Sequence, residues 1–277
     1  MIVRSPASSA NLGPGFDALA MALAIPFELR VGGHFLAAGV QVERHPAVVA
    51  FRQFGGVGPV GLHTSIPMGR GLGFSGAARV AGLVGALAQR AGDSFDLNEA
   101  RAEVLAAATE LEGHADNVAA SLYGGVIATA GGKVVQIPLA FDPAIVVWVP
   151  DGVETSTDSS RRRLPAMVTL DDAAFNVGRT ALLVAALASG RADALRDATA
   201  DRLHQDIRFE AVPDSRLALN RALQADAHAG WLSGSGPTVA ALCSHEAADA
   251  VASAMGAEGT GHTKVLRIDY AGTVIDH

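Results

Sequence analysis

The sequence predicts a protein of mixed helices and strands in two domains, and three observations carry this prediction. The chain has 277 residues, enough for one large or two modest domains, and 49% of them are apolar, enough to fill a core. Short apolar segments of strand length alternate with longer segments of helix length. A break at residues 139–143 then divides the chain into residues 1–142 and residues 143–277.

The first fifty residues predict short strands and one turn-rich loop. Strands are expected at residues 1–4, 27–31 and 39–44, and a short helix at residues 48–53. Residues 6–17 are rich in Ser, Asn, Gly and Pro, which favour turns. An apolar run, residues 18–25, follows this loop, and one interpretation of Asp17 is that it caps a helix formed by the run.

A glycine-rich segment, residues 67–78, lies between a predicted strand at residues 60–66 and a predicted helix at residues 77–91. It has four glycines within eight residues, and glycine lets a backbone adopt positive φ and approach a ligand closely. The helix that follows offers free N–H groups and its positive dipole end to an anion. The segment therefore predicts a phosphate-binding loop that is neither Walker A nor Rossmann in its spacing. The alternative is a glycine turn that only packs the helix against a sheet.

Beyond this segment, the hydrophobic pattern predicts one hairpin, several helices and two further strands. The hairpin joins residues 126–129 to residues 134–137 through Gly131-Gly132, and residues 145–149 form a buried strand. The expected helices are residues 98–111, 171–189, 191–203, 217–229 and 247–255, and the last strand is residues 265–269.

Composition excludes several classes of protein. The net charge is −7 and the basic residues are scattered apart from residues 161–163, which argues against a nucleic-acid-binding surface. The single cysteine, Cys243, rules out a disulfide framework or a cysteine-rich metal site and is expected in the core. The chain start has no signal-peptide pattern, and no apolar run approaches the roughly 18 residues of a membrane span. We therefore expect a soluble cytoplasmic protein.

Three polar clusters outside the glycine-rich segment are candidates for chemistry. Residues 112–117 gather a carboxylate, an imidazole, a second carboxylate and an amide; the alternative is a helix end with Gly113 as C-cap and Asp116 as the next N-cap. The arginines at residues 161–163 form a run of charge that is usually a solvated face. Residues 233–238 combine two glycines with Ser, Pro and Thr, and otherwise form a turn between a helix and a strand.

The glycine-rich segment resembles the ATP-binding motif of the GHMP kinases, which include galactokinase, homoserine kinase, mevalonate kinase and phosphomevalonate kinase. It follows the pattern Pro-x-x-x-Gly-Leu-Gly-x-Ser-x-Ala, but Phe74 stands where the family usually has the first of two serines, and Gly76 where it usually has alanine. The resemblance implies that the ATP contacts are made by Pro67, Gly69, Arg70, Gly71, Leu72, Gly73, Phe74, Ser75, Gly76 and Ala77.

Four further segments resemble homoserine kinases in particular, and a fifth resembles the third GHMP motif. Residues 6–17 resemble the N-terminal motif, and residues 156–165 match Ser-Thr-x-x-x-Arg-x-x-Leu-Pro. Residues 112–120 resemble Glu-Gly-His-Pro-Asp-Asn-Val-Ala-Pro, with alanine in place of both prolines. Residues 203–208 match Leu-His-x-Pro-Tyr-Arg in part, since Asp206 and Ile207 differ, and residues 233–238 match Ser-Gly-x-Gly-Pro-Thr fully.

These motifs imply roles for individual residues. Glu112 and Ser75 would coordinate Mg²⁺, which prefers oxygen donors. An anionic Asp17 would bind a substrate ammonium, and Arg161 and Arg208 would grip its carboxylate. The implied substrate-binding residues are Asn11, Asp17, His114, Asn117, Thr157, Arg161, Arg208 and Thr238, and the implied catalytic residues are Glu112, Ser75 and Asp17.

The resemblance also implies a fold and an activity. The fold is α+β, with an ATP-binding domain like domain 2 of ribosomal protein S5 at residues 1–142 and a ferredoxin-like domain at residues 143–277. The activity is transfer of the γ-phosphoryl group of MgATP to the hydroxyl of a small-molecule substrate, L-homoserine, in threonine biosynthesis. Two alternatives stay open: a kinase of threonine, pantoate or an isoprenoid alcohol, and a non-catalytic relative that binds a small molecule. A homodimer also stays open.

Overall fold

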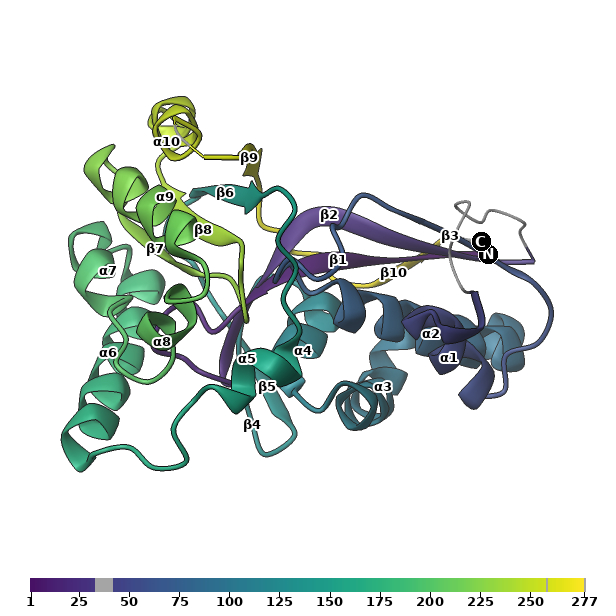
Figure 1. Cartoon of the computed structure of the whole chain (residues 1–277). Helices are drawn as coiled ribbons and strands as arrows, with labels where there is room; N and C mark the ends of the chain where they lie inside the picture. The colour runs from purple at the N-terminus through teal and green to yellow at the C-terminus, as the bar shows by residue number, and fades with distance from the viewer. Residues whose placement is uncertain (33–41, 258, 277) are drawn as a thin grey trace.

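The computed structural model describes residues 1–32, 42–257 and 259–276, which form two antiparallel sheets with helices packed on them (Figure 1). The first sheet has the order β10-β1-β2-β4-β5, and β3 also pairs with β2. Its strands are β1 (Ile2–Ala10), β2 (Leu19–Val31), β3 (Val60–Thr64), β4 (Val126–Ala130), β5 (Lys133–Ile137) and β10 (Val274–Asp276). The long β2 can hold two partners because its first part pairs with β4 and its last part pairs with β3.

Four helices lie on one side of the first sheet, below β1 and β2 in Figure 1; α2 and α4 pack on its strands, and α1 and α3 pack on these helices. They are α1 (Pro46–Gln53), α2 (Phe74–Ala91), α3 (Leu97–Glu112) and α4 (Ala115–Tyr123), with short 3-10 helices at η1 (Val42–Arg44) and η2 (Gly92–Ser94). Helix α2 lies at the centre of this layer and packs on β1, β2, α1, α3 and α4. It approaches α1 closely at Gly82, which has no side chain; a Cβ there would lie only 2.2 Å from the Ala47 carbonyl oxygen.

The second sheet has the order β7-β8-β6-β9, with α9 and α10 packed on one face. Its elements are β6 (Ala144–Pro150), α9 (Pro213–Gln224), β7 (Ala229–Leu232), β8 (Val239–Cys243), α10 (Ala248–Met255) and β9 (Gly261–Leu266). This strand-helix-strand-strand-helix-strand order is the ferredoxin-like arrangement that was expected. Buried Cys243 lies in the core between this sheet and its helices, as predicted.

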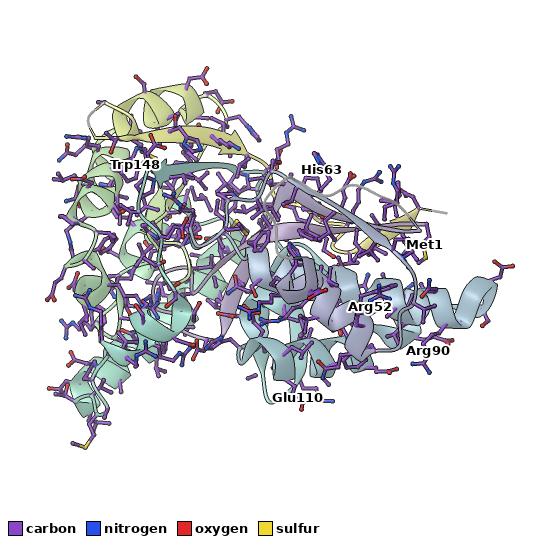
Figure 2. The ribbon with its side chains drawn as sticks, turned by 45° about the vertical axis from the view of Figure 1, so that its right-hand side comes forward. Met1, Arg52, His63, Arg90, Glu110 and Trp148 are labelled. Carbon is purple, nitrogen blue, oxygen red and sulfur yellow. The ribbon has the colours of Figure 1, made fainter. Side chains whose placement is uncertain are left out.

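Strand β6 is apolar throughout because both of its faces are buried. Val146 and Trp148 face α9 and α10, whereas Ile145 and Val147 belong to the core that contains β1, β2 and α2. Trp148 and Arg90, the latter near the end of α2, lie at opposite ends of the molecule (Figure 2). The core that contains β1, β2 and α2 holds side chains from both sheets and therefore joins them.

The segment between β6 and α9 forms further helices. They are α5 (Thr157–Arg162), α6 (Leu170–Ser189), α7 (Ala192–Ala198) and α8 (Gln205–Phe209). Leu183 and Leu187 of α6 and Leu195 of α7 are buried in the same core as the first sheet. Among the residues that the structure describes, no helix is long and apolar enough to cross a membrane.

Several predicted elements are wrong, beginning with those near the start of the chain. Residues 5–10 extend β1 instead of forming a loop, and the proline in this stretch is tolerated because the register shifts between Pro6 and Ala7. The apolar run at residues 18–25 is part of β2, so Asp17 caps no helix. Of the strand expected at residues 39–44, residues 39–41 lie outside the described residues, and η1 occupies the rest.

The other differences lie in the second part of the chain. The helix expected at residues 191–203 is only α7, and the helix expected at residues 217–229 lies earlier, as α9. The last predicted strand also lies earlier, as β9, and β10 was not predicted.

The division at residues 142 and 143 stays a prediction, although it falls between β5 and β6. Strand β10 returns from the second part to pair with β1, with Asp276 opposite Ile2. This pairing places the two chain ends side by side (Figure 1).

Candidate active site

A cavity of about 240 Å³ lies where the glycine-rich segment, the turn after β1, the start of α4, α5 and the residues 234–235 meet. The cavity brings together residues from widely separated parts of the chain. Of the predicted site residues, it is lined by Asn11, Asp17, Pro67, Gly69, Arg70, Gly71, Leu72, Gly73, Phe74, Ser75, Glu112, His114, Asn117, Thr157, Arg161 and Arg208.

Three predicted site residues do not line this cavity: Gly76, Ala77 and Thr238. Ala77 belongs to the apolar core against which α2 packs, and both Ala77 and Thr238 are fully buried. The backbone N–H of Thr238 donates to the Arg70 carbonyl at 3.3 Å, so this residue supports the glycine-rich segment from behind. The expected contact of these three residues with a ligand therefore stays a prediction.

The glycine-rich segment owes its shape to glycines at positive φ. Gly69, Gly71 and Gly73 have φ values of 64°, 75° and 66°. A Cβ at Gly71 would lie 2.3 Å from the Ser233 carbonyl oxygen, and one at Gly73 would lie 1.9 Å from Ser8 Oγ, so neither position has room for a side chain. Gly73 is also the N-cap of α2 and provides no side-chain hydrogen bond, which leaves the positive end of this helix open at the cavity.

Ser75 and Glu112 meet at the beginning of α2, as the resemblance implies. Ser75 Oγ donates to Glu112 Oε2 at 2.9 Å. The structure adds a partner that the sequence reasoning missed, because Arg79 Nη1 donates to Ser75 Oγ at 2.9 Å and forms an ion pair with Glu112 Oε2. Burial lowers the pKa of the Arg79 guanidinium from its ordinary value.

The turn after β1 is built from residues in left-handed conformations. Asn11, Leu12 and Asp17 have positive φ, which asparagine and aspartate tolerate better than most residues. The Asn11 amide is used within the turn, because Nδ2 donates to the Gly234 carbonyl at 3.1 Å and Oδ1 accepts from the Asp17 N–H at 3.1 Å. Asn11 therefore lines the cavity but chiefly holds Asp17 in place.

The three charged side chains predicted to bind the substrate meet in the cavity, and two of them already form an ion pair with each other. Arg161 Nη2 lies 2.6 and 2.8 Å from the two carboxylate oxygens of Asp17. Arg208 is 4% exposed; its Nη1 donates to the Gly234 carbonyl at 3.0 Å, and its Nε has no hydrogen-bond partner among the residues that the structure describes. Burial, followed by the charge of Arg161, lowers the pKa of Arg208 to about 10. Arg161 and Arg208 therefore offer two cations in the cavity to an anionic group.

The Phe16 ring lies beside the guanidinium groups of both arginines. Its ring centroid lies 5.1 Å from the Arg161 guanidinium carbon, 5.3 Å from that of Arg208, and 5.0 Å from the His204 ring. His204 Nε2 lies 2.8 Å from the Gly13 carbonyl, and its Nδ1 lies 3.1 Å from Arg208 Nη1. Burial holds the pKa of His204 below its ordinary value, which favours the neutral ring beside Arg208.

The start of α4 supplies His114, Asp116 and Asn117. Gly113 ends α3 at φ 83°, as predicted, but the N-cap of α4 is His114 and Asp116 lies inside the first turn, so that part of the alternative was wrong. Asn117 Oδ1 accepts from Ser8 Oγ at 2.9 Å. Burial, followed in size by the backbone hydrogen bond from Asn117, leaves the pKa of Asp116 raised to about 6. The pKa of His114 is lowered, chiefly by burial and then by Arg161.

Sequence reasoning missed several residues that line this cavity. Phe16 and Asp116 lie inside two of the recognised motifs, but neither was among the predicted site residues. The other missed lining residues are Ala10, Thr155, Ser156, Gly234 and Ser235. Thr155 is bound to the glycine-rich segment through its N–H, which donates to the Gly69 carbonyl at 2.9 Å.

The residues present fit a nucleotide and a divalent cation. The open N-terminus of α2 suits a phosphate group. Within the described ranges no group of three or more His, Cys, Asp and Glu side chains is arranged to hold a metal ion. Ser75 and Glu112 supply two oxygen donors, which fits a magnesium ion that takes its other ligands from phosphates and water.

Comparisons with known proteins identify the family of this chain. The chain matches the model of the GHMP kinases N terminal domain over residues 41–125 and that of GHMP kinases C terminal over residues 183–261. It is 41% identical to the homoserine kinase of Moorella thermoacetica over 262 residues, covering 87% of each chain. It is 43% identical to the homoserine kinase of Streptomyces avermitilis over 273 residues, covering 90% of this chain and 88% of the relative.

A solved structure supports the fold over the whole chain. The crystal structure of homoserine kinase from Cytophaga hutchinsonii superposes with a TM-score of 0.84 at 27% identity, covering 100% of this chain and 97% of that one. The two-domain fold and the site therefore define a kinase that phosphorylates an alcohol. The chain belongs to the GHMP kinase family. The relatives named above are homoserine kinases of this family.

Proposed function

We propose that this protein is a homoserine kinase, which transfers the γ-phosphoryl group of ATP to the hydroxyl of L-homoserine and forms O-phospho-L-homoserine and ADP. One observation carries the proposal: a single cavity is lined both by an open helix N-terminus with Ser75 and Glu112 and by Asp17 with Arg161 and Arg208. An acceptor with one ammonium and one carboxylate matches the second group of charges.

Bound MgATP would supply the phosphoryl group and a cation that neutralises phosphate charge. The chain itself would contribute mainly position and electrostatics, which is what phosphoryl transfer requires. The N-terminus of α2 would hold the phosphates, and Ser75 with Glu112 would hold the cation. We also propose a cytoplasmic location; a homodimer and the absence of nucleic-acid partners remain predictions.

Asp17, Arg161 and Arg208 would fix the amino acid. The Asp17 carboxylate is bound on both oxygens by Arg161, so we assign Asp17 to substrate binding and not to proton abstraction. A bound substrate would separate this ion pair, with its ammonium binding Asp17 and its carboxylate binding Arg161. Arg208 would add a second cation from a buried position, with Nε free of other partners.

The charges also separate homoserine from the other candidate alcohols. Mevalonate and pantoate carry a carboxylate but no ammonium, so Asp17 would repel them. Threonine carries the same two charges as homoserine, but its hydroxyl is one carbon closer to them. It is therefore the nearest competitor, and the distance between hydroxyl and charges would decide between the two.

An ATP-consumption assay with homoserine, threonine, pantoate and mevalonate tests this proposal. We expect homoserine to give the highest kcat/KM, with phosphohomoserine identified by mass spectrometry. A higher kcat/KM with pantoate or mevalonate would contradict the substrate assignment and leave the kinase assignment intact. Binding of ATP or homoserine by calorimetry without turnover of any alcohol would favour the non-catalytic alternative.

A further inference from the structure

Arg79 lies where two residues proposed to hold the metal converge. It follows Ser75 by four residues on α2, so the two side chains share one face of the helix. Its Nη1 atom donates to Ser75 Oγ at 2.9 Å and pairs with Glu112 Oε2, and Ser75 Oγ donates to the same carboxylate oxygen at 2.9 Å. The three groups therefore form a closed triangle in which a cation is already present.

The triangle is largely shielded from solvent. The side chains of Arg79 and Glu112 are 24% and 13% exposed. A guanidinium stays protonated in proteins even where burial lowers its pKa, as it does here. A charge-assisted hydrogen bond in such surroundings is stronger than a neutral one, so Glu112 gives up a favourable contact when it binds another cation.

We propose that Arg79 is a positioning residue that competes with the divalent cation for Glu112 and Ser75 and so weakens metal binding at this site. The inference rests on the proposed function, because it concerns the same metal ligands. Without metal, Arg79 holds the carboxylate and the hydroxyl in place and neutralises Glu112. With metal, two cations face one carboxylate, and the guanidinium must leave Glu112 or repel the ion.

The test measures Mn²⁺ binding directly, by the electron paramagnetic resonance signal of free Mn²⁺, in protein saturated with a non-hydrolysable ATP analogue. R79M removes the cation, and R79Q removes the charge but keeps a hydrogen-bonding side chain. R90M is the matched control, since Arg90 is an exposed arginine on the same helix, at the end of the molecule away from Trp148 (Figure 2). E112Q removes the carboxylate ligand.

We expect R79M and R79Q to bind Mn²⁺ at least about tenfold more tightly than the wild type, the scale of one charge-assisted hydrogen bond. R90M should stay within about twofold of the wild type, and E112Q should bind more weakly. Melting curves of each variant show whether it folds; R79Q keeps the test available if R79M does not fold.

Two results bear on different parts of the argument. Unchanged or weaker Mn²⁺ binding in R79Q, with weaker binding in E112Q, overturns the role of Arg79 and leaves the proposed metal ligands intact. Unchanged binding in E112Q overturns the metal assignment of the proposed function itself. A purely structural role for Arg79 predicts loss of affinity, whereas competition predicts a gain.

Discussion

Arg161 and Asp17, which are 144 residues apart in sequence, form an ion pair in which one guanidinium nitrogen lies 2.6 and 2.8 Å from the two carboxylate oxygens. The pair links α5 to the turn after β1. Both side chains are more than a third exposed, at 38% and 39%, so water screens the pair and it adds little to stability. Its value lies in position, because each partner can exchange the other for a complementary group of a substrate.

Replacing Asp17 with asparagine should weaken binding of homoserine. The new side chain keeps the size of the aspartate but loses the charge that an ammonium needs. We expect KM to rise at least about tenfold while kcat changes less, because the lost contact is made in ground state and transition state alike. Steady-state kinetics measures both, with D158N as control, since Asp158 is an exposed acid on α5 outside the cavity lining. An unchanged KM in D17N would remove Asp17 from the substrate site.

Replacing Glu112 with glutamine should lower kcat strongly. The change removes a charge proposed to hold the cation that stabilises phosphate charge in the transition state. Losses of one such electrostatic group are about a hundredfold or more in kcat. Glu110 provides the control E110Q, because it lies on the same helix and at the lower surface of the molecule in Figure 2. A kcat in E112Q within a few-fold of E110Q would contradict the assignment.

Phe74 is expected to affect stability and nucleotide binding separately. Its ring packs edge-on against Phe27 at 5.9 Å and His45 at 5.5 Å. Both F74A and F74S should therefore lower the free energy of unfolding by about 2 kcal/mol, less than a fully buried ring because Phe74 is half-buried. Only F74S adds a hydroxyl beside the phosphate site, so only F74S should tighten ATP binding. Denaturation and calorimetry test the two effects, and equal ATP affinities in F74A and F74S would refute the second.

Asp116 should make stability depend on pH. Burial raises its pKa to about 6, so the folded protein holds this proton more tightly than the unfolded chain, whose carboxyl has its ordinary value of 3.8. The contribution of Asp116 is therefore favourable below about pH 4 and is lost as pH rises through about 6. The loss is about 3 kcal/mol at most.

The variant D116N cannot ionise at this position and should escape that loss. Urea denaturation at pH 4 and at pH 8 measures the difference in unfolding free energy between D116N and the wild type. This difference should move in favour of D116N as pH rises. A difference that stays constant between the two pH values would show that Asp116 is not buried in ionisable form.

Local patterns were enough to predict many elements. The glycines of residues 69–76 followed by an uninterrupted apolar run identified α2 and its open N-terminus, because positive φ and helix propensity are properties of the local chain. The hairpin of β4 and β5 was predicted for the same reason, from two glycines between short strands. The motif residues that line the cavity were predicted from the resemblance of their segments to GHMP kinase and homoserine kinase motifs.

The first strand was harder to predict than α2. Residues 5–10 look like a loop because Ser and Pro favour turns, yet they continue β1 and pair with β2. This pairing bonds the backbone there and overrides the local preference. The first strand and its partner β10 lie at opposite ends of the sequence, and no local pattern records such a pairing.

The sequence by itself determined the family, the order of the motifs and the kinds of charge available to a ligand. Only the tertiary structure decided which charges meet: that Arg161 lies on Asp17, that Phe16 lies beside both Arg161 and Arg208, and that Arg79 lies on Glu112. The physical reason is that motifs are set by short-range backbone geometry, whereas ion pairs and burial depend on distances across the folded core. The pKa of Asp116 belongs to the second group, since desolvation is created by the residues that surround it.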